Sequence, residues 1–407
     1  MINRARRSIF FVFVLATLTA APACQTPAQP ADKGRLVRET VLDDLKSPWG
    51  MAFISADDVL ITEKEGGLVL ANVRTGERRM IAGLPSDLYD RVRSAAPFDN
   101  SGLFDVALDP DFASDRWVYL SYSAQTGDGL TTKVVRARLI DDALRDMQTL
   151  LVAAPFTKGQ YVHYGGGLAF GSDGALYVTI GERIFNERDN PALPIAQDVA
   201  DRRGKIYRLN RDGSIPPDNP DFGENAVPGL YAVGIRAAQG LTLNATTGEL
   251  WFSEHGSRQG DEINRLRPGA NYGWPIVTTG GYRNADYAPP PAGDTAFSEP
   301  VWSWRQTVAP TGLAFYAGEI FPEWRGDLFV SGLSRGSFWR FDFEDGRIVA
   351  VEELFVDDRI RSRDVAVAPD GALYMLTDTL LRPKPEGGFD NTGQPGGALL
   401  RLTRKNR

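Results

Sequence analysis

The chain of 407 residues has few of the side chains that build disulfide, metal and redox centres. It has one cysteine, Cys24, and two histidines, His163 and His255. A single cysteine excludes an intramolecular disulfide framework and a zinc cluster built on thiolates. Long helical periodicity is missing, and no long apolar run occurs beyond the N-terminus, which excludes a polytopic membrane protein. Any histidine chemistry must use one of two positions.

Composition and net charge exclude further classes of protein. Hydrophobic residues make up 43% of the chain and charged residues 24%, so a disordered chain is excluded. The formal net charge is −7 at pH 7, and we therefore predict no nucleic-acid partner.

The N-terminus has the pattern of a targeting segment. Three arginines precede a short apolar run and a stretch of small residues, which predicts a signal peptide over residues 1–23 and export to the periplasm. A linker rich in Pro and Gln follows over residues 24–36. Cys24 stands where a bacterial lipoprotein carries its lipidated cysteine. Both a lipid anchor at Cys24 and simple cleavage after Ala23 remain open.

A repeat of two apolar strands joined by a turn organises the rest of the chain. Turn pairs such as Asp173-Gly174 separate the strands, as hairpins require. The six copies begin near Trp49, Gly102, Gly167, Gly240, Gly312 and Asp364. They predict an all-β fold, a single six-bladed β-propeller over residues 37–407 with four strands in each blade and long inter-strand insertions in blades three and four. We expect Arg38–Leu45 to close the ring against the last blade, because a propeller otherwise leaves an open edge.

Unusual polar residues occur near the strand starts. His163 precedes a run of three glycines and suits a general base, although a structural histidine is the alternative. Arg236, Arg361 and Arg363 stand at strand starts, where arginines can converge on an anionic ligand in the central channel. Surface ion pairs are the alternative for each arginine.

A glycine-rich loop in blade four carries paired acids. Asp261 and Glu262 occur within residues 253–264, and Ca²⁺ prefers carboxylate and carbonyl oxygens. The spacing is not that of an EF-hand, and a solvated acidic loop is the alternative.

Seven motifs run in order along nearly the whole chain after the linker. They are Pro48–Phe53, Gly102–Phe112, Thr179–Arg183, Ala196–Asp198, Asp212–Pro220, Asp261–Asn264 and Asn271–Pro275. Together they resemble the soluble sugar dehydrogenases that depend on pyrroloquinoline quinone (PQQ), the glucose/sorbosone dehydrogenase family. The six-bladed propeller of that family agrees with the repeat count.

The resemblance implies roles for individual residues. His163 falls on the catalytic base that removes the proton of the anomeric hydroxyl while hydride passes to the quinone. Arg236 falls beside the quinone oxygens, where it would stabilise negative charge. The cofactor-binding positions carry Asn100, Arg236, Thr307, Arg335, Arg361 and Arg363. The carbonyls of Gly256 and Ser257 fall on ligands of a Ca²⁺ that the cofactor also coordinates, and Asp261, Glu262 and Tyr272 match a second, structural Ca²⁺ site.

The chain also departs from the family pattern. Ala237 replaces an asparagine that contacts the cofactor, and Val162 replaces an acid that orients the histidine in one branch of the family. Ser334 stands where a cofactor-binding lysine is usual, and the neighbouring Arg335 would have to compensate for it.

These observations predict an exported quinoprotein that oxidises an aldose at C1 to the lactone and passes its electrons to a separate acceptor. A Ca²⁺-dependent lactonase-type hydrolase is one alternative, because six-bladed propellers also carry that chemistry. A non-catalytic propeller that binds a sugar or a partner is another, and Val162, Ala237 and Ser334 favour it.

Overall fold

The computed structural model describes residues 36–404 except 91–98, 160–161, 185–186, 188–191, 335–336, 345, 357, 359, 379–381, 384–388 and 391–396. The predicted signal peptide, Cys24 and Arg335 lie outside the described residues. Within the described part, no helix is long and apolar enough to cross a membrane.

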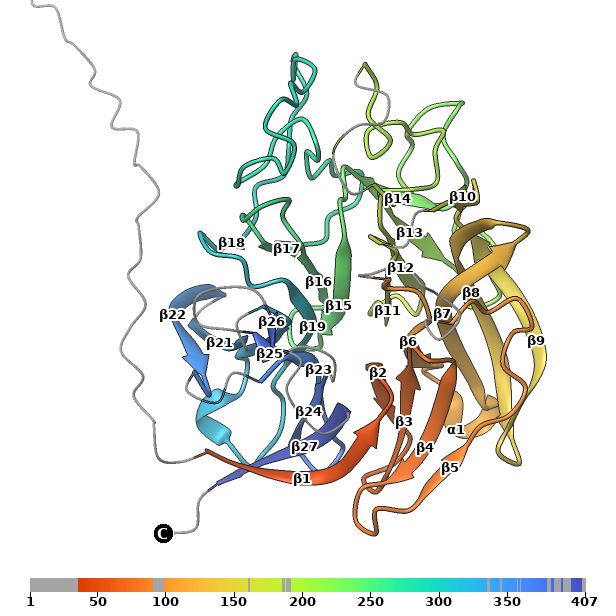
Figure 1. Cartoon of the computed structure of the whole chain (residues 1–407), viewed down its shortest axis with the longest axis vertical. Coiled ribbons are helices and arrows are strands. Elements are labelled where there is room, and N and C mark those ends of the chain that lie inside the picture. The colour runs from red at the N-terminus through yellow and green to blue at the C-terminus, as the bar shows by residue number, and fades with distance from the viewer. Residues whose placement is uncertain are drawn as a thin grey trace, which may run out of the picture.

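Six antiparallel sheets form a ring of blades (Figure 1). Blade one contains β2 (Pro48–Phe53), β3 (Asp58–Glu63), β4 (Gly67–Asn72) and β5 (Arg78–Met80). Blade two contains β6 (Leu103–Leu108), β7 (Trp117–Thr126), β8 (Gly129–Ile140), β9 (Ala143–Val152) and β10 (Thr157–Lys158). Blade three contains β11 (Gly165–Phe170), β12 (Leu176–Ile180), β13 (Lys205–Leu209) and β14 (Leu230–Val233).

The remaining three blades follow in chain order. Blade four contains β15 (Ala238–Asn244), β16 (Glu249–Glu254), β17 (Glu262–Arg265) and β18 (Trp302–Ser303). Blade five contains β19 (Pro310–Phe315), β20 (Leu328–Gly332), β21 (Ser337–Glu344) and β22 (Arg347–Leu354). Blade six contains β23 (Ser362–Val367), β24 (Leu373–Thr377), β27 (Gly397–Arg404) and β1 (Leu36–Leu45). Outside the blades lie α1 (Phe112–Asp115), the 3₁₀ turn η2 (Pro322–Trp324), β25 (Arg382–Pro383) and β26 (Phe389–Asp390).

The two ends of the described chain share one blade. Strand β1 pairs antiparallel with β27, from Leu36 opposite Arg404 to Leu45 opposite Gly397, and the two strands lie side by side in Figure 1. The innermost strands β2, β6, β11, β15, β19 and β23 contact one another in sequence, and β23 contacts β2. The predicted six-bladed ring, closed by the segment Arg38–Leu45, is therefore confirmed.

Blade two departs from the expected four strands. Strand β8 is 12 residues long and pairs with β9 from Lys133 to Ile140, so its first residues extend past β9. Strand β10 pairs with that end, through Gly129 and Leu130. The fifth strand follows from the length of β8, because an uncovered strand edge leaves backbone groups that another segment can pair with.

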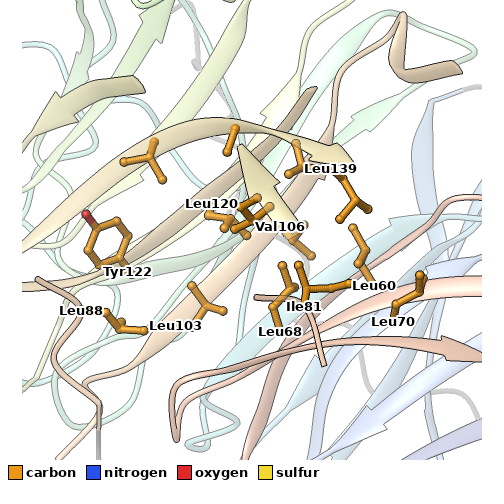
Figure 2. Packing of buried hydrophobic residues seen from close by; sticks show 14 of the residues in the cluster. Leu60, Leu68, Leu70, Ile81, Leu88, Leu103, Val106, Leu120, Tyr122 and Leu139 are labelled. Carbon is orange, nitrogen blue, oxygen red and sulfur yellow. The ribbon is translucent and has the colours of Figure 1, made fainter. Parts of the chain in front are cut away.

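The core lies between the blades. The buried apolar residues form six main clusters in the described part, one at each junction of neighbouring blades. Figure 2 shows the junction of blades one and two, where Leu60 and Leu68 face Val106 and Leu120. Alternating side chains of each strand thus pack against the next blade, which fixes how the strand starts of all six blades face the central channel.

Candidate active site

One cavity of about 470 Å³ gathers most of the predicted site residues. Its lining includes Asn100, His163, Arg236, Gly256, Ser257, Asp261, Thr307, Arg361 and Arg363. These residues lie near the starts of blades two to six or, for Gly256, Ser257 and Asp261, between β16 and β17, so the ring brings together positions up to 263 residues apart. Glu262 and Tyr272 are not among the lining residues, and Arg335 lies outside the described part. The roles assigned to the gathered residues stay predictions.

A small aromatic cluster forms part of the wall. Trp49, Phe104 and Tyr164 pack together. The ring centroid of Phe104 lies 5.9 Å from that of Trp49 and 5.1 Å from that of Tyr164. The guanidinium of Arg363 lies over the ring of Trp49, 4.4 Å from its centroid. The cavity thus combines flat apolar surfaces with positive charge, as a planar anionic ligand requires.

The backbone around His163 is held in an unusual conformation. His163 has φ 52°, a left-handed conformation that is rare for residues other than glycine and occurs often at functional sites. The carbonyl of His163 accepts the backbone N–H of Arg183 at 3.3 Å, and the Arg183 side chain donates to the carbonyl of Val162 at 3.1 Å. A Cβ on Gly181 would lie 2.0 Å from the carbonyl oxygen of His163, so this close packing requires glycine at position 181. The segment after β12 therefore positions the histidine.

Glu182 supplies a carboxylate beside the histidine. Its Oε1 lies 3.3 Å from His163 Nδ1 and 3.9 Å from Arg236 Nε, and the side chains of His163 and Glu182 are only 11% and 4% exposed. Its Oε2 accepts a hydrogen bond from the indole N–H of Trp274. The sequence indicated Glu182 only as part of the motif Thr179–Arg183, and Val162 in place of an orienting acid suggested that His163 is a poorer base. The structure places a carboxylate at the imidazole from the end of β12 instead, and only its position directly after a buried strand could have indicated this.

Burial sets the protonation state of His163. Burial lowers the pKa of His163 well below 6.5, and the positive charges of Arg236 and Arg283 lower it further. A buried imidazole among arginines is therefore neutral near pH 7, the state in which a histidine accepts a proton.

Arg236 connects the histidine to the loop of blade four. Its side chain is 3% exposed, and its Nη1 donates to the carbonyls of His255 at 3.1 Å and Gly256 at 2.8 Å. Burial lowers its pKa, and the charge of Glu182 partly offsets that effect. The Nε of Arg236 has no hydrogen-bond partner among the described residues. This nitrogen is buried and lies 3.9 Å from Glu182 Oε1, so the guanidinium is fixed between that carboxylate and the two carbonyls at the cavity wall.

The two carbonyls predicted to bind Ca²⁺ face positive charge. The Gly256 carbonyl accepts from Arg236, and the Ser257 carbonyl accepts from Arg283 Nη2 at 3.0 Å. Arg283 comes from the connection between β17 and β18, which extends away from its blade in Figure 1, and sequence reasoning did not single it out. Two guanidinium groups occupy these acceptors, and their positive charge disfavours a cation beside them, so the Ca²⁺ site at Gly256 and Ser257 stays a prediction.

The three residues predicted for a second Ca²⁺ site take part in separate hydrogen bonds. Asp261 accepts from the backbone N–H groups of Gly256, Val308 and Ala309 at 2.6–2.8 Å. Glu262 accepts from Thr279 at 2.8 Å, and the Tyr272 hydroxyl bonds to the backbone of Arg265 and Arg267. No group of three or more His, Cys, Asp or Glu side chains suited to a metal occurs in the described part. The second site therefore stays a prediction without support from the side-chain geometry.

The residues that depart from the family pattern lie in different surroundings. Val162 and Ser334 line the cavity, whereas Ala237 is fully buried and outside the lining. Asn100 and Thr307 are exposed at the cavity, and Thr307 donates to the carbonyl of Arg258 at 2.7 Å.

The fold and the cavity define a β-propeller whose strand starts form one cationic site around a buried histidine–glutamate pair. The sequence profile of the glucose/sorbosone dehydrogenase family matches residues 45–382. The chain therefore belongs to the glucose/sorbosone dehydrogenase family, and the predicted class, an oxidoreductase acting on sugars, is confirmed.

Individual relatives agree with the family assignment. The chain is 35% identical to the aldose sugar dehydrogenase YliI of Escherichia coli over 84% of this chain and 89% of that protein. It is 27% identical to quinoprotein glucose dehydrogenase B of Acinetobacter calcoaceticus over 98% of both chains. The PQQ-bound structure of an aldose sugar dehydrogenase from Streptomyces coelicolor superposes with a TM-score of 0.70 at 26% identity, over 93% of this chain and all of that one.

Proposed function

We propose that this enzyme is an exported quinoprotein that oxidises an aldose at C1 to the lactone, with PQQ as hydride acceptor and His163 as general base. The observation that supports this most directly is the neutral His163, with Glu182 Oε1 3.3 Å from its Nδ1 and Arg236 nearby, in a cavity that all six blades line. Two curated relatives are named as an aldose sugar dehydrogenase and a quinoprotein, and one solved neighbour holds PQQ.

His163 is placed to take the proton of the C1 hydroxyl. With a proton on Nδ1 directed to Glu182, Nε2 is the nitrogen whose lone pair accepts the substrate proton. The imidazolium that forms is stabilised by the Glu182 carboxylate. The sugar loses its C1 hydrogen as hydride and its hydroxyl hydrogen as a proton, which leaves the lactone. When bound, the quinone supplies the acceptor for the hydride.

The cationic residues would hold the cofactor. Arg361 and Arg363 line the cavity and suit its carboxylates, and Asn100 and Thr307 lie beside them in the lining. Arg236, a cation that lines the cavity, would stabilise the negative charge that develops on the acceptor oxygens.

We propose Ca²⁺ at the carbonyls of Gly256 and Ser257. These oxygens accept hydrogen bonds from Arg236 and Arg283, which Ca²⁺ would have to displace, and the negative charge of the bound quinone would offset the repulsion between the cations.

Export and anchoring rest on the N-terminal sequence alone. We propose that residues 1–23 direct the chain to the periplasm, and that an acceptor separate from this chain takes the electrons there. Replacing Cys24 with serine tests the anchor: a lipidated protein moves from the membrane to the soluble fraction, and a simply cleaved protein does not change its fraction.

Reconstitution tests the proposed reaction. The purified protein is loaded with PQQ and Ca²⁺ and assayed for dye reduction and lactone formation with a panel of aldoses. Dye reduction that requires both additions is the expected result. PQQ binding without turnover of any sugar would favour the non-catalytic propeller, and lactone hydrolysis without quinone would favour the hydrolase.

The lowered pKa of His163 predicts the pH dependence of turnover. A base is active when deprotonated, and a pKa below 6.5 extends the active range toward acid. We therefore expect turnover to stay constant from about pH 8 down to 6.5 and to fall only at lower pH. The measurement is turnover against pH at saturating sugar and cofactor. A fall centred above pH 6.5 would mean that this buried imidazole is not the base.

Replacing Arg361 with alanine should weaken cofactor binding first. Arg361 donates to the carbonyl of Leu333 at 2.8 Å and lies at the cavity, so its fixed guanidinium is ready for a carboxylate. Loss of one charge-assisted contact corresponds to about 1.5–3 kcal/mol, or roughly 10- to 150-fold in the dissociation constant of PQQ. A titration of the apoprotein with PQQ measures this, and turnover of the fully loaded variant should change much less.

A further inference from the structure

A buried carboxylate of blade six is shared by two cations that line the cavity. The Asp378 side chain is 1% exposed, and its Oδ2 lies 3.3 Å from Lys64 Nζ and 3.5 Å from Arg361 Nε. Burial alone would raise the pKa of Asp378, but Lys64, Arg361 and Arg363 together lower it far below its usual range. One acid therefore faces three cations at this wall.

The whole cavity has the same excess of positive charge. Among its described lining residues, Lys64, Arg236, Arg283, Arg361 and Arg363 are cationic, and Asp261 is the one acid. Asp261 directs both oxygens to backbone N–H groups, so its carboxylate does not face the lysine. Buried cations are stable only when anions or dipoles compensate their charge. The wall around Asp378 therefore favours the binding of a further anion.

Lys64 is fixed in place before any ligand binds. It directly follows β3, and its backbone N–H donates to the carbonyl of Ser47 at 3.0 Å. Gly102 packs so closely against it that a Cβ there would lie 2.2 Å from the Lys64 carbonyl oxygen. Its side chain is 4% exposed, so little rotamer freedom is left to lose on binding.

Lys64 lies where its ammonium group could replace that of the lysine that is usual in the family at the position of Ser334. Blade six, which carries Arg361 and Arg363, lies between blade five, which carries Ser334, and blade one, which carries Lys64. We propose that Lys64 is a further cofactor-binding residue: its ammonium, positioned by Asp378, holds a carboxylate of the bound quinone from the blade-one side. This inference rests on the proposed function. Sequence reasoning missed Lys64 because it occurs in a charged turn between two strands, a place where lysines are usually exposed.

Binding of two anions to the apoprotein tests the role of Lys64. PQQ is titrated by absorbance, and benzene-1,3,5-tricarboxylate, a planar anion without redox chemistry, is followed by thermal shift. Lys64→Met should weaken both by about 10- to 100-fold, whereas Lys64→Arg should retain most of the affinity. Lys133→Met is the matched control, because Lys133 pairs with Asp87 at 2.7 Å outside the cavity and should leave both affinities unchanged.

Asp378→Asn separates a binding role from a structural one. Removing the shared carboxylate should lower the melting temperature of the apoprotein, and PQQ should then raise it by more than in the parent, because the ligand becomes the main counter-charge. Equal PQQ affinity of Lys64→Met and the parent would overturn the inference while the proposed function stands. Weakened binding in Lys64→Met without sugar oxidation by the parent would support Lys64 and overturn the proposed reaction. Failure of the parent to bind either anion would overturn both.

Discussion

His163→Gln should lower the turnover of the loaded enzyme by roughly 10²–10⁴, the usual contribution of general acid–base catalysis. The side chain of His163 is the basic group that Glu182 orients in the cavity, and glutamine cannot accept the proton of the C1 hydroxyl. PQQ affinity should change little, since Arg236, Arg361 and Arg363 remain in the wall. Single-turnover dye reduction at saturating cofactor measures the first effect and titration the second.

Two further variants make this result specific. Because position 163 has φ 52°, His163→Asn is the second test, since asparagine tolerates that backbone better than most residues. His255→Gln is the comparison: burial lowers the pKa of His255 to about 3, and no proton transfer is assigned to it. Equal losses from the His163 and His255 variants, both through weaker PQQ binding, would contradict the assigned roles.

Glu182→Gln should lower turnover by about 10², because the amide no longer selects the protonated Nδ1 or stabilises the imidazolium. Glu182 Oε1 lies 3.3 Å from that nitrogen, and the geometry can otherwise persist because the amide oxygen still accepts from Trp274. PQQ affinity and melting temperature should stay near those of the parent protein. Steady-state turnover at saturating PQQ is the measurement.

A matched surface variant controls for the loss of charge. Glu249→Gln removes an exposed acid that pairs with Arg265 at 3.4 Å, far from the cavity lining, and should leave turnover unchanged. Glu182→Asp should restore only part of the activity, since its shorter side chain draws the carboxylate back from the imidazole. Full activity in Glu182→Gln would mean that the carboxylate does not position the base.

The blade count could be predicted because each hairpin is encoded locally. Short apolar runs form the strands and turn residues such as Asp173-Gly174 lie between them, so the pattern repeats wherever a blade begins. Closure by Arg38–Leu45 followed from the need to cover the last edge. The fifth strand of blade two could not be predicted, since it depends on the relative lengths of β8 and β9 after pairing.

The site could be predicted only in part. The scarcity of histidine indicated His163 as a candidate site residue, and the position of arginines at strand starts indicated Arg236, Arg361 and Arg363. The structure places all four in one cavity. Glu182, Lys64 and Arg283 escaped sequence reasoning because charged residues are common in turns and long connections. Their roles arise from partners on other blades, which spacing along one chain does not show.

The sequence by itself determined the strands, their grouping into six blades and the kinds of side chain at each blade start, because these depend on short apolar runs and local turn chemistry. Only the tertiary structure decided which charges meet. Lys64 reaches Asp378 across 314 residues, and the ring places His163 beside Glu182 and near Arg236 and Arg283, whose positive charge lowers its pKa. Burial and distance in three dimensions set the strength of charge interactions, so the chemistry of the cavity depends on the closed propeller.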